Sequence, residues 1–200
     1  MGRYKNFSEL RTHEEEGMDY EIYVRKGLSG IAVMAPHGGG IEPGTTDIAD
    51  SVAGNEHTFY CFKGIKPSGN SSLHITSSAF DEPKGIIVAE EADFVITIHG
   101  CSGKNDSIYI GGNDQNSIKR LSHELALAGF AVMDKPRPGL EGTKKTNLCN
   151  RGRTGRGVQI EISSGLRSKM LKQIDNDILN HNKSFIVFID ILKHFLKNTL

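Results

Sequence analysis

Two histidines follow the two apolar runs that we predict to be the most buried strands of the chain. His37 follows residues 31–35 after one proline, and Glu42 comes five positions later. His99 follows residues 93–98 directly. Two imidazoles and one carboxylate, with a fourth position left for water, form the open ligand set of a catalytic zinc ion. The pattern therefore indicates a single metal site made by His37, Glu42 and His99.

The three glycines that follow His37 suit such a site. Glycine lets the backbone curl tightly, so that Glu42 can reach the ion that His37 binds, and it leaves room for a substrate. A histidine at the end of a strand is more often only a hydrogen-bonded polar residue. The zinc interpretation therefore depends on all three side chains meeting at one point.

Glu161 is a carboxylate inside the otherwise apolar run 158–162. A buried carboxylate costs several kcal/mol unless something pairs with it. One interpretation makes Glu161 the general base of a metal-assisted hydrolysis, which needs a proton acceptor near the attacking water. The alternative is a structural ion pair with Arg151, Arg153 or Arg156, which are near in sequence.

Other chemistries have weaker signals. His37 and its glycines resemble an esterase oxyanion loop, but the chain contains no G-x-S-x-G nucleophile motif. Cys101 lies two residues after His99, yet such close neighbours in sequence rarely have the geometry of a nucleophile and its base. The glycine-rich GRTGRG segment lacks the G-K-[ST] ending of a phosphate-binding loop.

Composition sets the broad class of the protein. The chain has 200 residues, a formal net charge of +0 and three cysteines without a C-x-x-C motif. We therefore expect one catalytic domain over residues 1–200, with residues 1–19 as a peripheral helical segment. A disulfide framework is not expected, and no segment reaches the ~20 apolar residues of a membrane span or has the apolar core of a signal peptide.

Charge is unevenly distributed along the chain. Residues 1–100 hold 8 Lys and Arg against 15 Asp and Glu, whereas residues 101–200 hold 16 against 9. The basic excess is densest from Lys135 to Lys169, where nine Lys and Arg stand against only Glu141 and Glu161. Such a segment is either a solvated loop or a surface that meets an anion.

The apolar patterns that must position these residues alternate between strands and helices. Strands are predicted at 20–24, 31–35, 57–62, 93–98, 107–111, 130–133 and 158–162. Helices are predicted at 8–16, 45–53, 114–128, 166–179 and 184–197. This alternation predicts an α/β three-layer sandwich around a mostly parallel or mixed sheet, in which ligands bind beyond the carboxyl ends of the strands.

Five blocks of the sequence together resemble the phage-type poly-γ-glutamate hydrolase family. They are MAPHGGGIEPGT, AFDEPKG, VITIHGCSG, YIGG and NLCNRGRTGRGVQIEIS, in this order. The resemblance runs from about Tyr20 to Lys197. It implies a zinc carboxypeptidase-like fold with one Zn²⁺ per chain, and an endo-hydrolase of γ-glutamyl amide bonds that helps a phage through the polymer around its host.

The resemblance also implies roles for individual residues. It implies that His37, Glu42 and His99 bind zinc and that Glu161 is the general base. It also implies that Arg151 contacts the oxyanion or a carboxylate of the substrate. The gap from His37 to Glu42 is longer than the H-x-x-E spacing of ordinary carboxypeptidases, which the glycines make plausible.

The polymer carries a free carboxylate on every residue. Because basic side chains bind carboxylates, the basic run supplies three further candidates for substrate binding. They are Arg153, Arg156 and Lys144.

Two other functions compete with this one. A zinc amidohydrolase of small acyl-amino acids would have a closed pocket in place of a groove. A nucleic-acid-binding replication protein has only the basic run in its favour, without interleaved aromatic residues, so no nucleic acid is expected. We expect a monomer without membrane contact, made in the cytoplasm and released by lysis.

Overall fold

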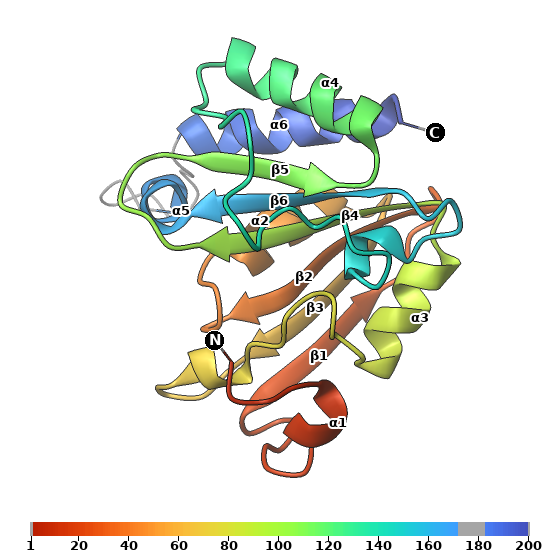
Figure 1. The fold of residues 1–200 in the computed structure, drawn as a ribbon, viewed down its shortest axis with the longest axis vertical. Coiled ribbons are helices and arrows are strands. Elements are labelled where there is room, and N and C mark those ends of the chain that lie inside the picture. The colour runs from red at the N-terminus through yellow and green to blue at the C-terminus, as the bar shows by residue number, and fades with distance from the viewer. Residues whose placement is uncertain (1, 172–182, 200) are drawn as a thin grey trace.

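The computed structural model describes residues 2–171 and 183–199, and its centre is a six-stranded sheet (Figure 1). In chain order the strands are β1 Tyr20–Arg25, β2 Ile31–Gly39, β3 Thr58–Gly64, β4 Phe94–Cys101, β5 Ile108–Gly112 and β6 Gly157–Ser163. Their spatial order is β1-β3-β2-β4-β6-β5. The predicted mixed sheet is thereby confirmed.

The four inner strands run parallel, and the two edge strands run antiparallel to their neighbours. β3 pairs with β2, β2 with β4 and β4 with β6 in parallel, while β1 and β5 pair antiparallel with β3 and β6. The carboxyl ends of the four inner strands therefore lie side by side, along the edge of the sheet that runs across the strands. Ligand sites of such sheets form at this edge.

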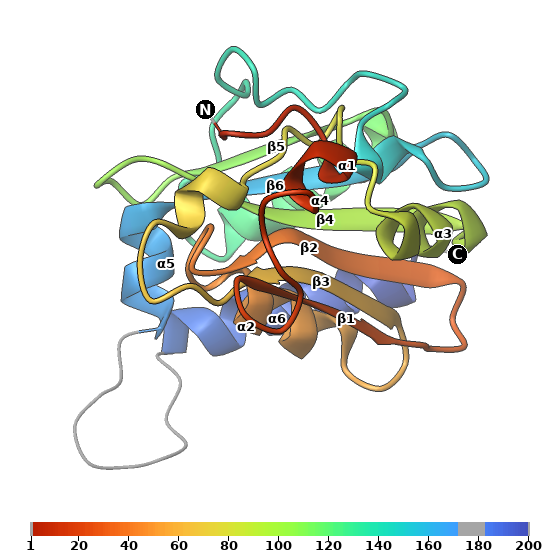
Figure 2. The ribbon, with the colours of Figure 1, turned by 90° about the horizontal axis from the view of Figure 1, so that it is seen from below.

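Helices cover both faces of the sheet (Figure 2). One layer is formed by α2 Thr45–Ala53, α4 Gln115–Leu127, α5 Ser164–Leu171 and α6 Lys183–Lys197. The opposite layer is formed by α1 Phe7–Leu10, α3 Pro83–Glu91 and the 3₁₀-helices η1 Asn70–Leu73 and η2 Leu148–Asn150. The predicted three-layer arrangement is what the structure shows.

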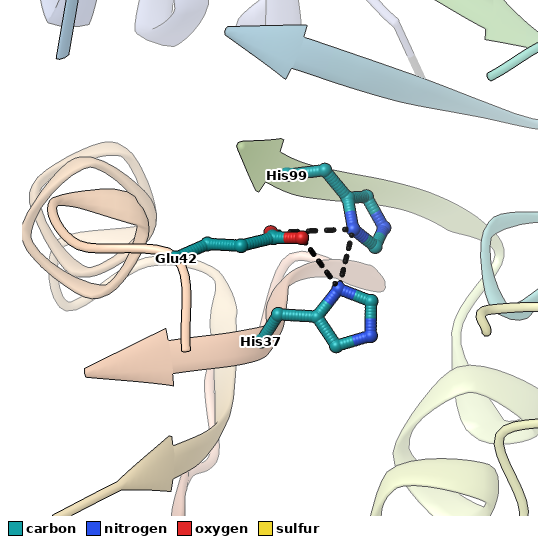
Figure 3. A group of neighbouring side chains, drawn as sticks. All are labelled: His37, Glu42 and His99. Carbon is teal, nitrogen blue, oxygen red and sulfur yellow. Dashed lines mark hydrogen bonds and ion pairs between the residues drawn. The ribbon is translucent and has the colours of Figure 1, made fainter. Parts of the chain in front are cut away.

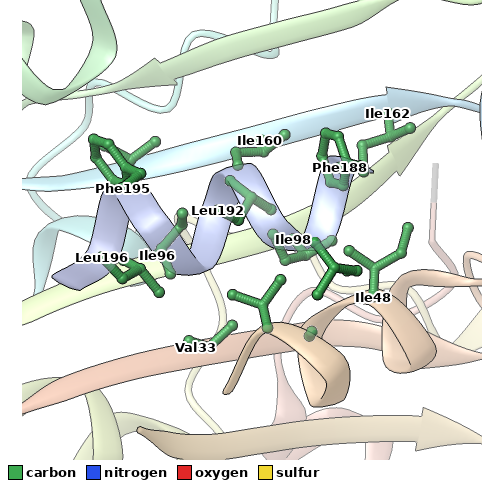
Figure 4. Close-up of a cluster of buried hydrophobic side chains, with 14 of the residues drawn as sticks. Val33, Ile48, Ile96, Ile98, Ile160, Ile162, Phe188, Leu192, Phe195 and Leu196 are labelled. Atoms are coloured by element: carbon green, nitrogen blue, oxygen red, sulfur yellow. The ribbon is translucent and has the colours of Figure 1, made fainter. Parts of the chain in front are cut away.

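The larger core lies between the sheet and α6. α6 presents Phe188, Leu192, Phe195 and Leu196 to alternate residues of β4 and β6, namely Ile96, Ile98, Ile160 and Ile162 (Figure 4). Because successive side chains of a strand point to opposite faces, the residues next to these isoleucines along each strand face the other layer. His99 and Glu161 are among them.

The segment 130–133 is not the strand that its apolar residues predicted. It forms only an isolated bridge, between Val132 and Ile108 at the start of edge strand β5. Two prolines, Pro136 and Pro138, follow within a few residues and have no N–H to continue a ladder. The prediction of a strand there was wrong.

Two helices also differ from the prediction. α3 was missed, although Pro83 stands at its first turn and Glu82 caps it by accepting the N–H groups of Lys84 and Gly85. The helix predicted at 166–179 is observed as α5 up to Leu171, and its remainder lies outside the described residues.

The N-terminal segment contributes side chains to the smaller core. α1 is only four residues long: Asn6 caps its start in place of Ser8, and the helix ends at Leu10 and not at residue 16. Phe7 and Leu10 are buried in the smaller core, together with Tyr4. The segment is therefore attached to the rest of the chain by apolar packing.

Candidate metal centre

A β-bulge in β2 directs His37 toward the site. The register of β2 against β3 shifts between Ala35 and Gly38, so that β2 has one residue more than its partner. In a regular strand His37 would share the face of Ala35, which lies in the core beneath α2 and α6. The bulge turns the imidazole to the opposite face. There its Nε2 lies 2.6 Å from the carbonyl oxygen of Ile75.

The glycines after His37 allow the chain to turn back within a crowded space. A Cβ atom on Gly38 would lie 2.3 Å from the Sγ atom of Cys61 and 2.5 Å from Oγ1 of Thr46. Gly39 has a φ of 61°, which favours glycine. The turn closes when the N–H of Glu42 donates to the carbonyl of His37 at 3.0 Å. The predicted role of the glycines in bringing Glu42 back is thus supported by the local geometry.

His37, Glu42 and His99 converge at one point (Figure 3). The Nδ1 atoms of the two imidazoles are 3.0 Å apart. The carboxylate of Glu42 lies 3.1 Å from Nδ1 of His37 and 3.7 Å from Nδ1 of His99. One ligand atom from each residue lies within 4.8 Å of the others, as a shared metal ion requires.

Hydrogen bonds behind the imidazoles orient them for a metal. A carbonyl oxygen can only accept, so Nε2 of His37 carries a hydrogen toward Ile75 and a neutral His37 turns the lone pair of Nδ1 to the centre. Nε2 of His99 lies 3.2 Å from Oγ of Ser77. Such partners on the outer nitrogen are typical of metal-binding histidines. Two inward ring nitrogens and a carboxylate therefore form a donor set that fits zinc.

Charge at the centre favours an ionised Glu42. Burial by itself would raise the pKa of this carboxyl, but His37 and His99 hold it well below its usual value. The backbone N–H of Gly100 donates to Oε2 of Glu42 at 2.7 Å and further stabilises the carboxylate. A negatively charged ligand is thus fixed between the two imidazoles.

His74 is a third imidazole at the edge of the group. Its ring centroid lies 4.0 Å from that of His37, and its Nε2 lies 3.7 Å from Oε1 of Glu42. Burial and the neighbouring His37 lower the pKa of His74 to about 3. The structure thus places His74 in the wall of the cleft beside the metal ligands.

Glu161 lies beside His99 on the neighbouring strand. The two residues are register partners of β6 and β4, and Glu161 is only 6% exposed. Burial raises the pKa of its carboxyl. The Nε2 atom of Gln159 donates to Oε1 of Glu161 at 3.1 Å, and Asn147 in turn donates to Oε1 of Gln159 at 2.9 Å. Within the described ranges, no arginine forms an ion pair with Glu161, contrary to the structural alternative.

The group opens into a cleft of about 1070 Å³. The segment from Arg137 to Lys144 lines one wall, and its side chains are largely exposed to solvent. Nη1 of Arg137 donates to the carbonyl of Ser102 at 3.0 Å, and its guanidinium lies 4.9 Å from the ring centroid of Tyr109. In the described part of the chain, neither Arg137 nor Lys144 pairs with a carboxylate, so both charges are available to an anion in the cleft.

The other predicted cations lie elsewhere. Nε of Arg151 donates to the carbonyl of Thr146, and its guanidinium lies 4.0 Å from Glu90, outside the cleft lining. Arg153 pairs with Asp93 at 2.9 Å, just before β4 begins, and Arg156 directly precedes β6. Both therefore lie at the amino ends of strands whose carboxyl ends point to the site. Of the four predicted cations, the structure brings only Lys144 into the cleft.

Sequence reasoning missed several residues that line or support the cleft. Gln159 stands two positions before Glu161, so the alternation of β6 places both on one face, and this signal was in the sequence. Arg137 lies in the basic run that was singled out, but nothing there distinguished it from its neighbours. Ser77 and Ile75 come from a loop whose approach to the histidines has no local signal.

The fold and the site define an α/β protein with a buried His–Glu–His centre at the carboxyl edge of a mixed sheet. The chain belongs to the poly-gamma-glutamate hydrolase family, whose family model matches residues 4–195.

Relatives from Bacillus subtilis (strain 168) support this assignment. The UPF0714 protein YndL is 35% identical over 98% of this chain and 78% of its own length. The SPbeta prophage-derived UPF0714 protein YoqZ is 32% identical over 99% of this chain and 73% of its own length.

Solved structures share the fold over nearly the whole chain. YndL in a zinc-free form has a TM-score of 0.90 at 35% identity and covers 100% of this chain and 99% of its own. A bacteriophage poly-gamma-glutamate hydrolase has a TM-score of 0.90 at 30% identity, covering 98% and 96%. The N-formylglutamate amidohydrolase of Ralstonia eutropha JMP134 has a TM-score of 0.54 at 9% identity, covering 89% and 95%, and shares the fold alone.

Proposed function

We propose that this protein is a zinc-dependent endo-hydrolase that cleaves γ-glutamyl amide bonds within poly-γ-glutamate. The observation that carries the proposal is the convergence of His37, Glu42 and His99 in a cleft, in a member of the poly-gamma-glutamate hydrolase family. One zinc ion per chain would be held by these three residues. When bound, zinc polarises a carbonyl group and lowers the pKa of water to ~7.

Glu161 is the proposed general base. Its carboxylate borders the same cleft as the ligand group and is held by Gln159. In this mechanism Glu161 accepts a proton from the attacking water and passes it to the leaving amine. A buried carboxyl with a raised pKa suits the second step, because its protonated form persists to higher pH.

Arg137 and Lys144 are the proposed contacts to the carboxylates of the polymer. Both line the cleft, and neither is neutralised by a carboxylate of the described residues. A guanidinium binds a carboxylate in bidentate fashion, whereas a lysine acts as a point charge. We place Arg137 before Arg151, Arg153 and Arg156 in this role, because these three lie outside the cleft lining.

A polymer suits the site better than the two competing ligands do. The solvent-exposed wall of the cleft leaves room for a polymer chain to extend past the scissile bond. An enzyme for a small acyl-amino acid would instead have a closed pocket around its substrate. Nucleic acid would need the basic run as one surface, yet Arg151 and Arg153 face Glu90 and Asp93.

We also propose that a phage uses the enzyme against the capsule polymer of its host after release by lysis. The proposal draws on the similarity to a bacteriophage hydrolase and to a prophage-derived protein. None of the described helices is long and apolar enough to cross a bilayer.

The direct test is to incubate the purified protein with poly-γ-glutamate and follow chain length by size-exclusion chromatography. Rapid appearance of intermediate lengths is expected from internal cleavage. A chelator should abolish the reaction, and added zinc should restore it. Metal analysis should give about one zinc per chain. Full activity in a metal-free sample would exclude the proposed mechanism.

A further inference from the structure

Arg167 is a buried arginine on α5 that lies behind the candidate metal centre. It is 6% exposed. Its guanidinium donates three hydrogen bonds, all to backbone carbonyl groups: Nη1 to Pro43 at 2.5 Å, Nε to Ile162 at 3.0 Å and Nη2 to Cys101 at 3.4 Å. Within the described ranges, no carboxylate pairs with it. Burial lowers its pKa, although Glu42 and Glu161 oppose the shift.

Each of the three carbonyl groups belongs to a segment that carries one functional side chain. Pro43 directly follows Glu42, Cys101 follows His99 by two residues, and Ile162 directly follows Glu161. These segments are the loop after β2, the end of β4 and the end of β6. Of them, only β4 and β6 are joined to each other by strand pairing. The loop with Glu42 has no such ladder to hold it.

Gly100 makes room for this guanidinium. A Cβ atom at position 100 would lie 2.4 Å from the Cζ atom of Arg167 and 2.6 Å from its Nη2. A side chain at position 100 would therefore displace this guanidinium. This gives a physical reason for the His99–Gly100 pair.

We infer that Arg167 is the positioning residue that fixes the Glu42 loop against β4 and β6, and so sets the distance between Glu42 and the two imidazoles. The inference rests on the proposed metal site. A planar guanidinium can donate in three directions at once, whereas the ammonium of a lysine is a single point at the end of a flexible chain. Arg167→Lys keeps the charge but cannot hold all three carbonyls.

The test measures zinc affinity by competition with a chromogenic chelator, together with kcat and KM on poly-γ-glutamate. Arg167→Lys is expected to weaken zinc binding by about tenfold or more, as loss of supporting contacts around metal ligands does. We expect kcat to fall while KM changes little, because Arg137 and Lys144, the proposed contacts to the substrate, are unchanged. Gly100→Ala should act similarly, because it displaces the guanidinium while keeping the N–H that Glu42 accepts.

Arg120→Lys is the matched control. Arg120 also donates to backbone carbonyls, those of Phe195 and Asn198, but it joins α4 to the end of α6, away from the site. Both lysine variants should lower the melting temperature, and only Arg167→Lys should weaken zinc binding. Zinc affinity of Arg167→Lys within twofold of the wild type, or an equal loss in Arg120→Lys, would overturn the inference. Absence of zinc binding by the wild type would instead refute the proposed function.

Discussion

The two histidines of the centre present the same ring atom, Nδ1, to Glu42 and to each other. The other nitrogen of each ring has a polar partner, a backbone carbonyl for His37 and a hydroxyl for His99. Glu161 is likewise held through an amide, that of Gln159. At the level of single residues, the chemistry therefore depends on neutral polar partners that orient the reactive atoms.

Replacing the proposed base tests its role most directly. Glu161→Gln keeps the shape of the side chain but cannot accept a proton, so kcat should fall by about 10²- to 10⁴-fold with zinc content unchanged. Glu141→Gln is a suitable control, because Glu141 lines the same cleft and, among the described residues, its carboxylate accepts only the N–H of Gly139. Activity and zinc should be measured on the same samples. Near-normal activity of Glu161→Gln would remove Glu161 from the mechanism.

The cations of the cleft should affect substrate binding. Arg137→Gln should raise KM for poly-γ-glutamate severalfold at low salt, and the difference from the wild type should shrink as salt screens the charge. Arg153→Gln is the control, because Arg153 pairs with Asp93 at the other end of the strands. An equal effect of both variants, or no dependence on salt, would argue against a specific carboxylate contact at Arg137.

At the scale of secondary-structure elements, the site is a product of one irregularity and one regular alternation. The bulge in β2 moves His37 to the cleft face, whereas the plain alternation of β4 and β6 places His99 and Glu161 there. The glycine turn after the bulge then returns the chain past β3 and α2. The site forms only when β2, β4 and β6 come together, because each strand carries only some of its residues.

Crowding of the turn should make Gly38 difficult to replace. Gly38→Ala introduces a methyl group 2.3 Å from the Sγ atom of Cys61, which the packed surroundings must absorb. We expect a loss of ~1–3 kcal/mol in the free energy of unfolding, measured in urea, with weaker zinc binding. Gly152→Ala is a milder control, because its added Cβ would lie 3.2 Å from its nearest neighbours. Equal stability of both variants would show that the turn can relax.

At the scale of the whole molecule, the N-terminal segment is tied to the sheet by a buried polar group. The hydroxyl of Tyr4 donates to Glu14 at 2.5 Å, and Lys66, just after β3, donates to the other oxygen of Glu14 at 2.6 Å. Burial of Glu14 opposes its ionisation, but the hydrogen bonds from Lys66 and Tyr4 outweigh this and lower the pKa of the carboxyl. The segment is thus linked to the sheet by charge as well as by apolar packing.

Stability should report this link through its pH dependence. A carboxyl with a lowered native pKa stabilises the fold fully above its unfolded pKa of ~4.3, and this contribution is lost as pH falls through the native value. Glu14→Gln should therefore cost ~1–3 kcal/mol at pH 7, and the difference from the wild type should shrink in acid. Urea unfolding from pH 7 to pH 3 measures this, with the exposed Glu15 changed to Gln as control. A pH-independent difference would contradict the charge argument.

Much of the architecture was predictable, because apolar periodicity is local. The strands at 20–24, 31–35 and 93–98 and the helix at 45–53 lie where the pattern placed them. The strand predicted at 130–133 was wrong, because this apolar segment is a loop that forms only one bridge to edge strand β5. α3 was missed, although its proline and capping glutamate were visible in the sequence.

The sequence by itself determined the alternating α/β order and the metal-ligand candidates His37, Glu42 and His99. These follow from residue type and from what stands next in the chain. Only the tertiary structure decided which cations face the cleft, that Arg137 does so and Arg153 does not, and that Arg167 supports the centre. The reason is physical: such contacts join segments far apart in the chain, and their geometry depends on strand register, a bulge and helix packing.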